Sequence, residues 1–327
     1  WAVSIMDYGE TFKRQRRYLQ QNFRKQSLSN YHHIQTQEVH RLLNDLLVDP
    51  DNHAAHLKRL SGGIIMRIAY GHQVLSRDDH FIGIAEKGVL TIEAVGAIGA
   101  HIVDFVPWLR HIPDWMPGAG FKRLPPGTRE DLYNFLHLPF EQVKAQMASG
   151  TATQCYTTTL MEETRGDDEE GVRSTAAIIY AGDLTSLKTQ TLSAINTAIL
   201  VLAANPVIQA RAQAEMDVVV GSDRLPTFSD RERMPYMQCI ISETFRWGAT
   251  TPVGVPHRLC EDDYYRGYYL PKDSMIIANA WGMLHDPRVY PDPERFNPDR
   301  FLEGEGRTPQ PDPRGPAFGF GRRQAHT

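Results

Sequence analysis

The sequence predicts a mainly α-helical fold with a small β-sheet, and three observations support this prediction. Apolar residues recur at helical spacing through most of the chain before Trp247. After Trp247 the pattern changes to short runs rich in tyrosine, valine and isoleucine, which favour strands. From Asp286 onward closely spaced prolines exclude a long helix.

The size and charge of the chain limit what it can be. It has 327 residues, of which 41% are hydrophobic and 9% aromatic, so it can bury a large core. Since we find no internal repeat and no domain-like linker, we interpret residues 1–327 as one domain and expect a monomer. The formal net charge of −4 gives no general attraction for polyanions, which argues against nucleic acid as a partner.

Cys155, Cys239 and Cys260 lie far apart in the sequence and show neither metal-site spacing nor a paired framework. We therefore expect a reducing compartment, with no disulfide scaffold and no zinc site. No charged segment followed by an apolar run opens the chain, so a targeting segment is either absent or removed. The longest uncharged stretch, 189–210, is interrupted by polar residues and by Pro206, and we expect a buried helix there rather than a membrane span.

Seven segments carry the apolar spacing of helices. The first, 9–23, also contains interspersed lysine and arginine and is therefore a basic amphipathic helix. The segment 176–204 is long and mostly uncharged, as expected for a helix through the middle of a helical protein. In chain order, the other five segments lie at 39–47, 57–70, 132–147, 206–220 and 233–247.

The remaining segments favour loops and strands. Prolines and glycines in 107–127 exclude regular structure, and four consecutive acids in 166–171 indicate a solvated loop. Alternating apolar residues in 253–277, with turn residues between them, predict short strands and a hairpin. The segment 304–316 is predicted to be a loop.

One acid–base pair in the last predicted helix has the spacing of an internal ion pair. Glu243 and Arg246 are three residues apart and share a helix face. Their apolar neighbours Ile240, Phe245 and Trp247 indicate burial, and a buried pair needs further donors to offset desolvation. We therefore expect a second arginine nearby.

Arg300, in Phe296-Asn-Pro-Asp-Arg-Phe-Leu, supplies that arginine. With Glu243 and Arg246, this segment resembles the Glu-x-x-Arg and Pro-Glu-Arg-Phe motifs of the cytochrome P-450 superfamily, with Asp299 in place of the usual glutamate. The resemblance is to the eukaryotic microsomal type and is fungal-like. It implies the cytochrome P-450 fold and a buried ionic lock of Glu243, Arg246 and Arg300 that serves folding and haem retention.

The end of the chain is similar to the haem-binding loop of that family, Phe-x-x-Gly-x-Arg-x-Cys. The sequence Phe318-Gly-Phe-Gly-Arg-Arg-Gln-Ala places Phe318, Gly321 and Arg323 at the family positions. Glycines let the backbone approach the porphyrin, and a cysteine thiolate binds the iron. Ala325 stands at the cysteine position, so the sequence predicts no metal ligand there.

The resemblance also implies side chains for the two haem propionates, which require cationic or hydrogen-bonding partners. Phe12 and Arg16 match family positions in the early basic helix. Arg258 matches one in the strand after Pro256, and Arg323 matches one in the loop.

In the family that the chain resembles, an acid and a threonine of the central helix deliver the protons for oxygen activation. Ala181-Gly-Asp-Leu-Thr-Ser is similar to that motif, with Asp183 one place early and Thr185 as the relay hydroxyl. Counting back from Pro206 gives a register about one turn later, and Thr189 shares a helix face with Thr185. Either threonine can be the relay residue, and we favour Thr185.

The resemblance implies a haem-dependent monooxygenase that contains haem b and acts on a small apolar organic substrate. Electrons are expected from NADPH through a flavoprotein reductase, which the basic helix at 9–23 could dock. The full-length protein is expected on the cytosolic face of the endoplasmic reticulum membrane. By the same resemblance the chain is a partial catalytic domain, incomplete at both ends, that lacks the amino-terminal anchor region and the part from the ligand cysteine onward.

A second hypothesis is a catalytically inactive fragment or pseudoenzyme that at most binds an apolar ligand or a partner. Ala325, the irregular central-helix motif and the missing ends favour it. A third, weaker hypothesis makes 92–109 a surface that dips into a membrane. A packed helix pair is the alternative for that segment, since charged residues are scattered through it.

Overall fold

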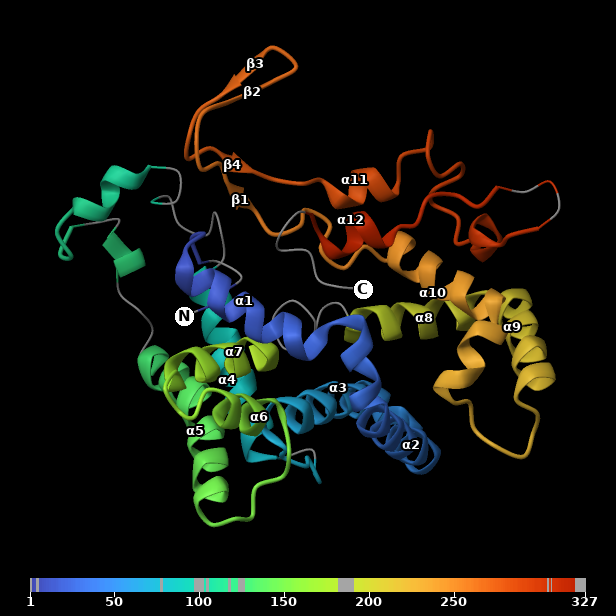
Figure 1. Ribbon diagram of the computed structural model, residues 1–327. Helices are drawn as coiled ribbons and strands as arrows, with labels where there is room; N and C mark the ends of the chain where they lie inside the picture. The colour runs from blue at the N-terminus through green and yellow to red at the C-terminus, as the bar shows by residue number, and fades with distance from the viewer. Residues whose placement is uncertain are drawn as a thin grey trace. The chain divides into compact units, whose positions relative to one another are not determined.

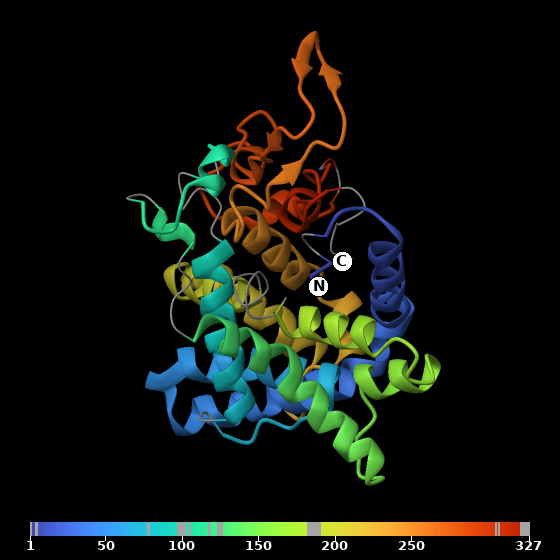
Figure 2. The same ribbon diagram turned by 90° about the vertical axis from the view of Figure 1, so that its left-hand side faces the viewer.

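Figures 1 and 2 show a computed structural model of the protein in two views. The structure describes residues 2–3, 6–76, 79–96, 103, 106–116, 119–122, 127–181, 191–304, 306 and 308–320. The chain divides into two compact units, Trp1–Lys188 (unit 1) and Thr189–Thr327 (unit 2). Each unit has an apolar core of its own. The prediction that residues 1–327 form one domain stays a prediction.

Unit 1 is built from helices, and the predicted helical segments are confirmed. Its α-helices are α1 (Glu10–Phe23), α2 (His32–Val48), α3 (His53–Tyr70), α4 (His80–Gly96), α5 (Thr128–Ala148), α6 (Tyr156–Glu163) and α7 (Glu169–Ala181). Short 3₁₀ helices lie between them: η1 (Lys25–Tyr31), η2 (Pro50–Asn52), η4 (Pro107–His111) and η5 (Ala119–Lys122).

The core of unit 1 forms where α3 packs on α6 and α7 and where α4 packs along α5 (Figures 1 and 2). The ring of Tyr180 from α7 stacks on Phe135 from α5, with 5.0 Å between centroids. It also meets Tyr70 from α3 edge-on at 5.7 Å. Met66 and Leu160 have no exposed surface, and burial of such a side chain contributes about 1.5–3 kcal/mol.

Asp168 connects α1 to the start of α7. Its Oδ2 accepts a hydrogen bond from the Tyr18 hydroxyl at 2.9 Å and lies 3.0 Å from Arg14 Nε. Its Oδ1 accepts from the Gly171 N–H at 3.2 Å, which satisfies a free donor of the first helical turn. The prediction of a loop at 166–171 is therefore wrong for its second half, because α7 begins at Glu169.

Unit 2 combines helices with two short antiparallel strand pairs. Its helices are α8 (Ser193–Ala204), α9 (Pro206–Val219), η8 (Phe228–Arg233), α10 (Pro235–Trp247), α11 (Ala280–Leu284), η9 (Pro298–Phe301) and α12 (Arg314–Phe318). Its strands are β1 (His257–Arg258), β2 (Asp263–Tyr265), β3 (Tyr268–Leu270) and β4 (Met275–Ile276).

The strands form two separate pairs rather than one small sheet. In β1 and β4, His257 lies opposite Ile276. The hairpin of β2 and β3 projects from unit 2 in Figure 1. Arg266 and Gly267 at its tip have φ angles of 51° and 85°, as a two-residue hairpin turn requires.

Two predicted loops contain short helices. In 304–316 the prediction of a loop is wrong at its end, where α12 begins at Arg314. The Asp312 carboxylate accepts the Arg314 N–H at 3.0 Å, and Pro316 falls in the first turn, where no N–H is needed. In 107–127 the prediction of no regular structure is corrected by η4 and η5, since Pro107 is favourable at the first position of a helix.

The predicted long helix at 176–204 is represented by α7 and α8. Residues 182–190 lie outside the described residues, so their continuity stays a prediction. In the described part of the chain, no single helix is long and apolar enough to cross a membrane. The pair α8 and α9 together has the length and composition of a membrane span, but the two helices are bent by 108° at their junction.

Candidate functional site

An acid and an arginine meet inside unit 2 on one face of α10. The side chains of Glu243 and Arg246 have no exposed surface. Arg246 Nε donates to Glu243 Oε2 at 2.7 Å, and Arg246 Nη2 donates to Oε1 at 2.8 Å. Such a paired arrangement of two planar groups is both strong and directional.

Arg300 of η9 completes this group, which we call the α10 ion cluster (Glu243, Arg246 and Arg300). Its Nε donates to Glu243 Oε1 at 3.0 Å. The backbone N–H of Asn297 donates to the same oxygen at 2.8 Å. The carboxylate therefore receives bonds from two guanidinium groups and one amide, which offsets the cost of burying its charge.

Other donors of the two arginines bind backbone carbonyl oxygens. Arg246 Nη1 donates to Leu284 O at 3.0 Å. Arg300 Nη1 donates to Pro291 O at 2.9 Å. These bonds fix the proline-rich segment 284–300, which has little regular structure, against α10. The structure thus brings together the three residues that the motifs indicated.

Sequence reasoning missed the uncharged partners of the α10 ion cluster. Gln310 Oε1 accepts from Arg300 Nη1 at 3.1 Å. The ring of Tyr290 lies 5.6 Å from Arg246 Cζ, within the range of a cation–π contact. Both residues come from irregular segments, whose path no periodic pattern predicts.

Phe318, the first residue of the predicted haem loop, lies beside α10. Its ring meets Phe245 edge-on, with 5.0 Å between centroids. The loop therefore starts next to the helix that carries the ion cluster. The other predicted loop residues and the predicted relay residues lie outside the described residues: Gly321, Arg323, Ala325, Asp183 and Thr185.

Phe12 and Arg16 lie one turn apart on α1 in unit 1. Phe12 is buried, with 4% of its surface exposed, and its ring lies 5.5 Å from that of Tyr8. Arg16 is half-buried, and burial lowers the pKa of its guanidinium because the charge loses water. An anionic group bound beside Arg16 would stabilise the guanidinium charge and raise its pKa again.

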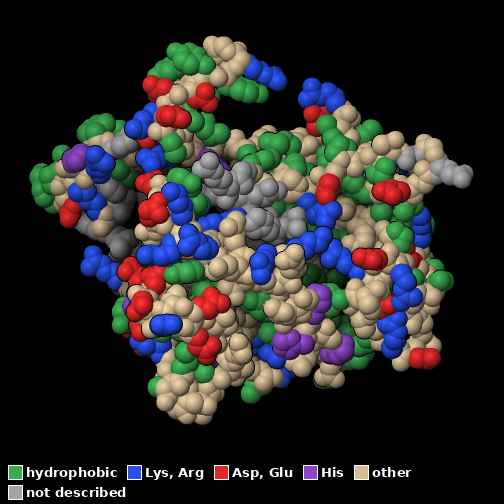
Figure 3. All heavy atoms as spheres, in the orientation of Figure 1, with side chains coloured by type: hydrophobic (Ala, Val, Ile, Leu, Met, Phe, Trp, Pro, Cys, Tyr) green, Lys and Arg blue, Asp and Glu red, His purple; other side chains and the backbone are tan. Residues whose placement is uncertain are grey.

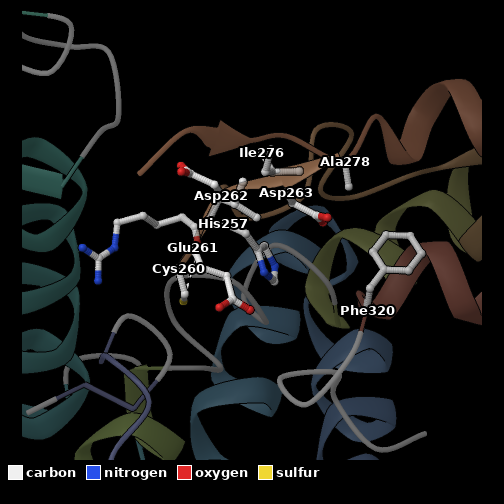
Figure 4. Close-up of a pocket in the computed structure, with 10 residues that line it drawn as sticks. His257, Cys260, Glu261, Asp262, Asp263, Ile276, Ala278 and Phe320 are labelled. Atoms are coloured by element: carbon white, nitrogen blue, oxygen red, sulfur yellow. Dashed lines mark hydrogen bonds between the residues drawn. The ribbon is translucent and has the colours of Figure 1, made fainter. Parts of the chain in front are cut away.

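Arg258 of β1 is exposed, and its Nη1 donates to Asp273 Oδ1 at 3.1 Å. It borders a cavity of about 550 Å³ in unit 2. Figure 4 shows His257 and Glu261 extending to one side of this cavity and Phe320 on its far side. The structure therefore places Arg258 against a carboxylate of the protein, and its haem-propionate role stays a prediction.

Unit 1 holds a second buried ion cluster, which the sequence analysis did not find. Arg59 Nη1 donates to Glu38 Oε2 at 2.8 Å, and Arg59 Nε donates to Asp45 Oδ2 at 3.1 Å. Arg67 Nη1 reaches Glu38 Oε1 at 3.4 Å. We call Glu38, Asp45, Arg59 and Arg67 the α2–α3 ion cluster, because it joins those two helices.

Comparison with known proteins identifies the family. A sequence model described as cytochrome P-450 matches residues 2–324. The chain belongs to the cytochrome P-450 family. The match extends over both units and ends just before Ala325.

Fungal relatives have the same family name. Cytochrome P-450 monooxygenase 176 of Postia placenta is 39% identical over 98% of this chain and 62% of its own length. Cytochrome P-450 monooxygenase claR of Ampulloclitocybe clavipes is 34% identical over 98% of this chain and 59% of its own length. The chain therefore spans about three fifths of the length of the relatives it matches.

The family implies haem, and the residues present fit it only in part. Arg16 offers a desolvated cation for a propionate, but position 325 offers no thiolate. Burial raises the pKa of Cys155, and burial with the nearby Glu215 raises that of Cys239 to about 11, so both thiols stay protonated at neutral pH. The chain as written therefore does not fit haem at the iron, and we derive no reaction step through it.

Proposed function

We propose that the complete protein represented by this chain is a haem-dependent monooxygenase that inserts one atom of O₂ into a small apolar organic substrate. The α10 ion cluster, in a chain that the family model matches over 2–324, carries the proposal. Haem with an axial thiolate would supply the oxygen chemistry. The chain's own contribution is a rigid support, since Glu243 and the two arginines hold the segment 284–300 on α10.

Other residues have supporting roles in this proposal. Arg16 and Arg323 would neutralise haem propionates, and Asp183 with Thr185 would deliver protons. Arg258 would join them with the donors that Asp273 does not use, and loss of the Asp273 contact would cost little, because exposed ion pairs contribute little.

We further propose that electrons come from NADPH through a flavoprotein reductase that docks on α1. Figure 3 shows Lys and Arg side chains gathered over this helix. Arg17 and Lys25 are exposed, whereas Arg14 is held by Asp168. Replacement of both Arg17 and Lys25 by glutamate should slow reduction and weaken its salt dependence. An unchanged salt dependence would remove α1 from the docking surface.

The location proposed for the full-length protein is the cytosolic face of the endoplasmic reticulum membrane. Its support is the resemblance to the microsomal type. Fractionation of cells that express the tagged full-length product should recover it in microsomes, accessible to protease added from the cytosolic side. Recovery in another fraction would contradict this location.

The test of the proposed activity starts with the full transcript. A cysteine codon shortly after the Arg323 codon in the messenger RNA would mean that the 327-residue sequence is a partial or faulty translation. The purified product of that message should bind haem. With NADPH and a reductase it should oxidise NADPH faster in the presence of an apolar substrate and form an oxygenated product. A full-length product that lacks haem would contradict the proposal.

A second candidate function rests on Ala325 itself. If the message encodes alanine at this position, the protein is a non-catalytic member of the family that binds an apolar ligand or a partner. Substrate-type binding without thiolate chemistry would support this candidate, and oxygenated product would exclude it.

A further inference from the structure

Unit 1 contains a cavity of about 560 Å³ that the proposed function does not use. Its walls come from the end of α1, from η1, from the start of α2, from the last turns of α3, from the loop before α6 and from the start of α6. Gly71 explains why that loop lies so close to α3. Its φ of 68° ends the helix, and a Cβ atom there would lie 3.0 Å from Thr153 O. The cavity is therefore a product of how unit 1 folds.

The lining of this cavity contains positive and hydrogen-bonding side chains but no aspartate or glutamate. Arg67 and His33 contribute a cation and an imidazole. The amides of Asn22 and Asn30 and the hydroxyl of Thr153 add further polar groups. Figure 3 shows histidine side chains over the start of α2, where this wall of the cavity lies. A concave surface of this charge attracts oxyanions.

Arg67 has donors left for such an anion beside its contact with Glu38. Its contact with Glu38 Oε1 is long, at 3.4 Å, whereas Arg59 holds the other carboxylate oxygen, Oε2, at 2.8 Å. Within the described residues Arg67 makes no other side-chain hydrogen bond, and 19% of its side chain is exposed. A guanidinium carries several N–H donors in a fixed fork, so Arg67 can bind a carboxylate or phosphate and keep Glu38.

The rest of the lining is uncharged. Ile34 and Ile68 line it and are 8% and 5% exposed. The ring of Tyr31 is stacked on Phe23, with 5.6 Å between centroids. The Cys155 thiol stays protonated, since burial raises its pKa. The volume lies in the range of small-molecule sites and leaves room for the organic body of a ligand beside its acid group.

We propose that this cavity binds a small organic oxyanion, a carboxylate or phosphate ester that carries a ring. Its acid group would lie on Arg67 and His33, and its ring would lie against Ile34 and Ile68. The site is independent of the proposed monooxygenase activity, because every residue that lines it belongs to unit 1 and none is assigned to haem.

Isothermal titration of the 327-residue chain tests this proposal, with phenyl phosphate and benzoate as anionic probes and benzyl alcohol as a neutral one. We expect one site for at least one anion and no binding of the alcohol. The tighter of the two anions identifies the acid group. Binding should also raise the unfolding temperature, since the ligand binds only the folded protein.

Three variants locate the site. Arg67→Gln should weaken anion binding about tenfold or more, because a charged hydrogen bond is lost. Asn30→Asp, at an exposed position of η1, should weaken it similarly through charge repulsion and keeps the proposal testable if Arg67→Gln does not fold. Arg129→Gln removes an exposed arginine of α5 outside the cavity and should leave binding unchanged.

Three results would overturn the proposal. One is binding of benzyl alcohol as tight as that of the anions, which would make the cavity merely apolar. Another is equal weakening by Arg129→Gln and Arg67→Gln, which would indicate general charge attraction. The last is no binding of either anion to the folded chain at about 1 mM, near the weak end of specific affinity.

Discussion

The two buried ion clusters differ in how their charges are shared. In the α10 ion cluster of unit 2, one carboxylate serves two arginines, and all three side chains are almost completely buried. In the α2–α3 ion cluster of unit 1, Arg59 divides its donors between two carboxylates. There the side chains of Arg67 and Asp45 are 19% and 27% exposed, so they also contact water.

This difference has an energetic consequence. Loss of Glu243 would leave two guanidinium groups in a site that water does not reach, where an unpaired charge is costly. Loss of Glu38 would leave Arg59 with Asp45 and Arg67 with solvent. In the described structure Arg59 Nη2 is buried and has no hydrogen-bond partner. Every buried side-chain nitrogen or oxygen of Glu243, Arg246 and Arg300 has one. The number of alternative partners, and not the number of ion pairs, therefore sets the cost of breaking each cluster.

The largest effect is expected for Glu243→Gln. The amide cannot neutralise Arg246 and Arg300, so unit 2 should lose about 3–5 kcal/mol of stability, which is enough to prevent folding. Urea unfolding followed by circular dichroism measures the change. The matched control is Glu232→Gln, which alters an exposed glutamate of the same unit. Stability equal to that of the control would show that the cluster does not hold unit 2 together.

A smaller effect is expected for Glu38→Gln in unit 1, about 2 kcal/mol, because Arg59 keeps Asp45 and Arg67 keeps its contact with water. The rate of thiol labelling shows where the protein opens. Cys155 in unit 1 should label faster in this variant, and Cys239 in unit 2 should keep its rate, since both are buried in the native protein.

Glu163→Gln, at an exposed position of α6, is the control and should change neither rate. Faster labelling of Cys239 alone would contradict the separation of the two clusters. A loss of stability as large as that of Glu243→Gln would contradict the argument from alternative partners.

The smallest effect concerns Asp230, a carboxylate at the start of η8 whose partners are close in sequence. Hydrogen bonds from Arg224 and Thr227, with a further bond from Arg233, hold its pKa well below the ordinary value of 3.8. Because the folded pKa is lowered, this contribution to stability is complete above about pH 4 and is lost as the pH falls below it.

Thermal unfolding between pH 7 and pH 2 tests this dependence. Asp230→Asn should unfold at a lower temperature than the native sequence at neutral pH. The difference should shrink below about pH 4, because the Asp230 carboxylate of the unfolded chain then becomes protonated while that of the folded protein is still ionised. A difference that stays constant across this range would show that the charge of Asp230 is not the cause.

Sequence reasoning found one ion cluster and missed the other for a physical reason. Glu243 and Arg246 are three residues apart on one helix, and their spacing is visible without knowing the fold. Glu38 and Arg59 belong to different helices and meet only because α2 packs on α3. The helices of unit 1 were predictable from apolar spacing, whereas α12 begins with a hydrogen bond from the Arg314 N–H to Asp312 that no periodicity reveals.

Prediction of the candidate site from the sequence was limited in the same way. The motifs indicated Glu243, Arg246, Arg300 and Phe318, and the structure brings them to α10 and its neighbours. The pairing of Arg258 with Asp273 could not be predicted, because it depends on the geometry of the connection between β1 and β4. The cavity beside Arg67 was not predicted either, because its lining residues come from six segments.

The ligand position at Ala325 is tested most directly by the carbon monoxide difference spectrum of the reduced 327-residue chain supplied with haem. We expect no thiolate-type band. Alanine cannot bind iron, and Cys155 and Cys239 are buried with raised pKa values. Cys260 is exposed, but it lies far before the predicted haem loop in the sequence. A chain that takes up haem but shows no such band would agree with the family assignment and with the absence of a ligand at this position. A stable thiolate-type band would contradict the placement of the ligand at position 325.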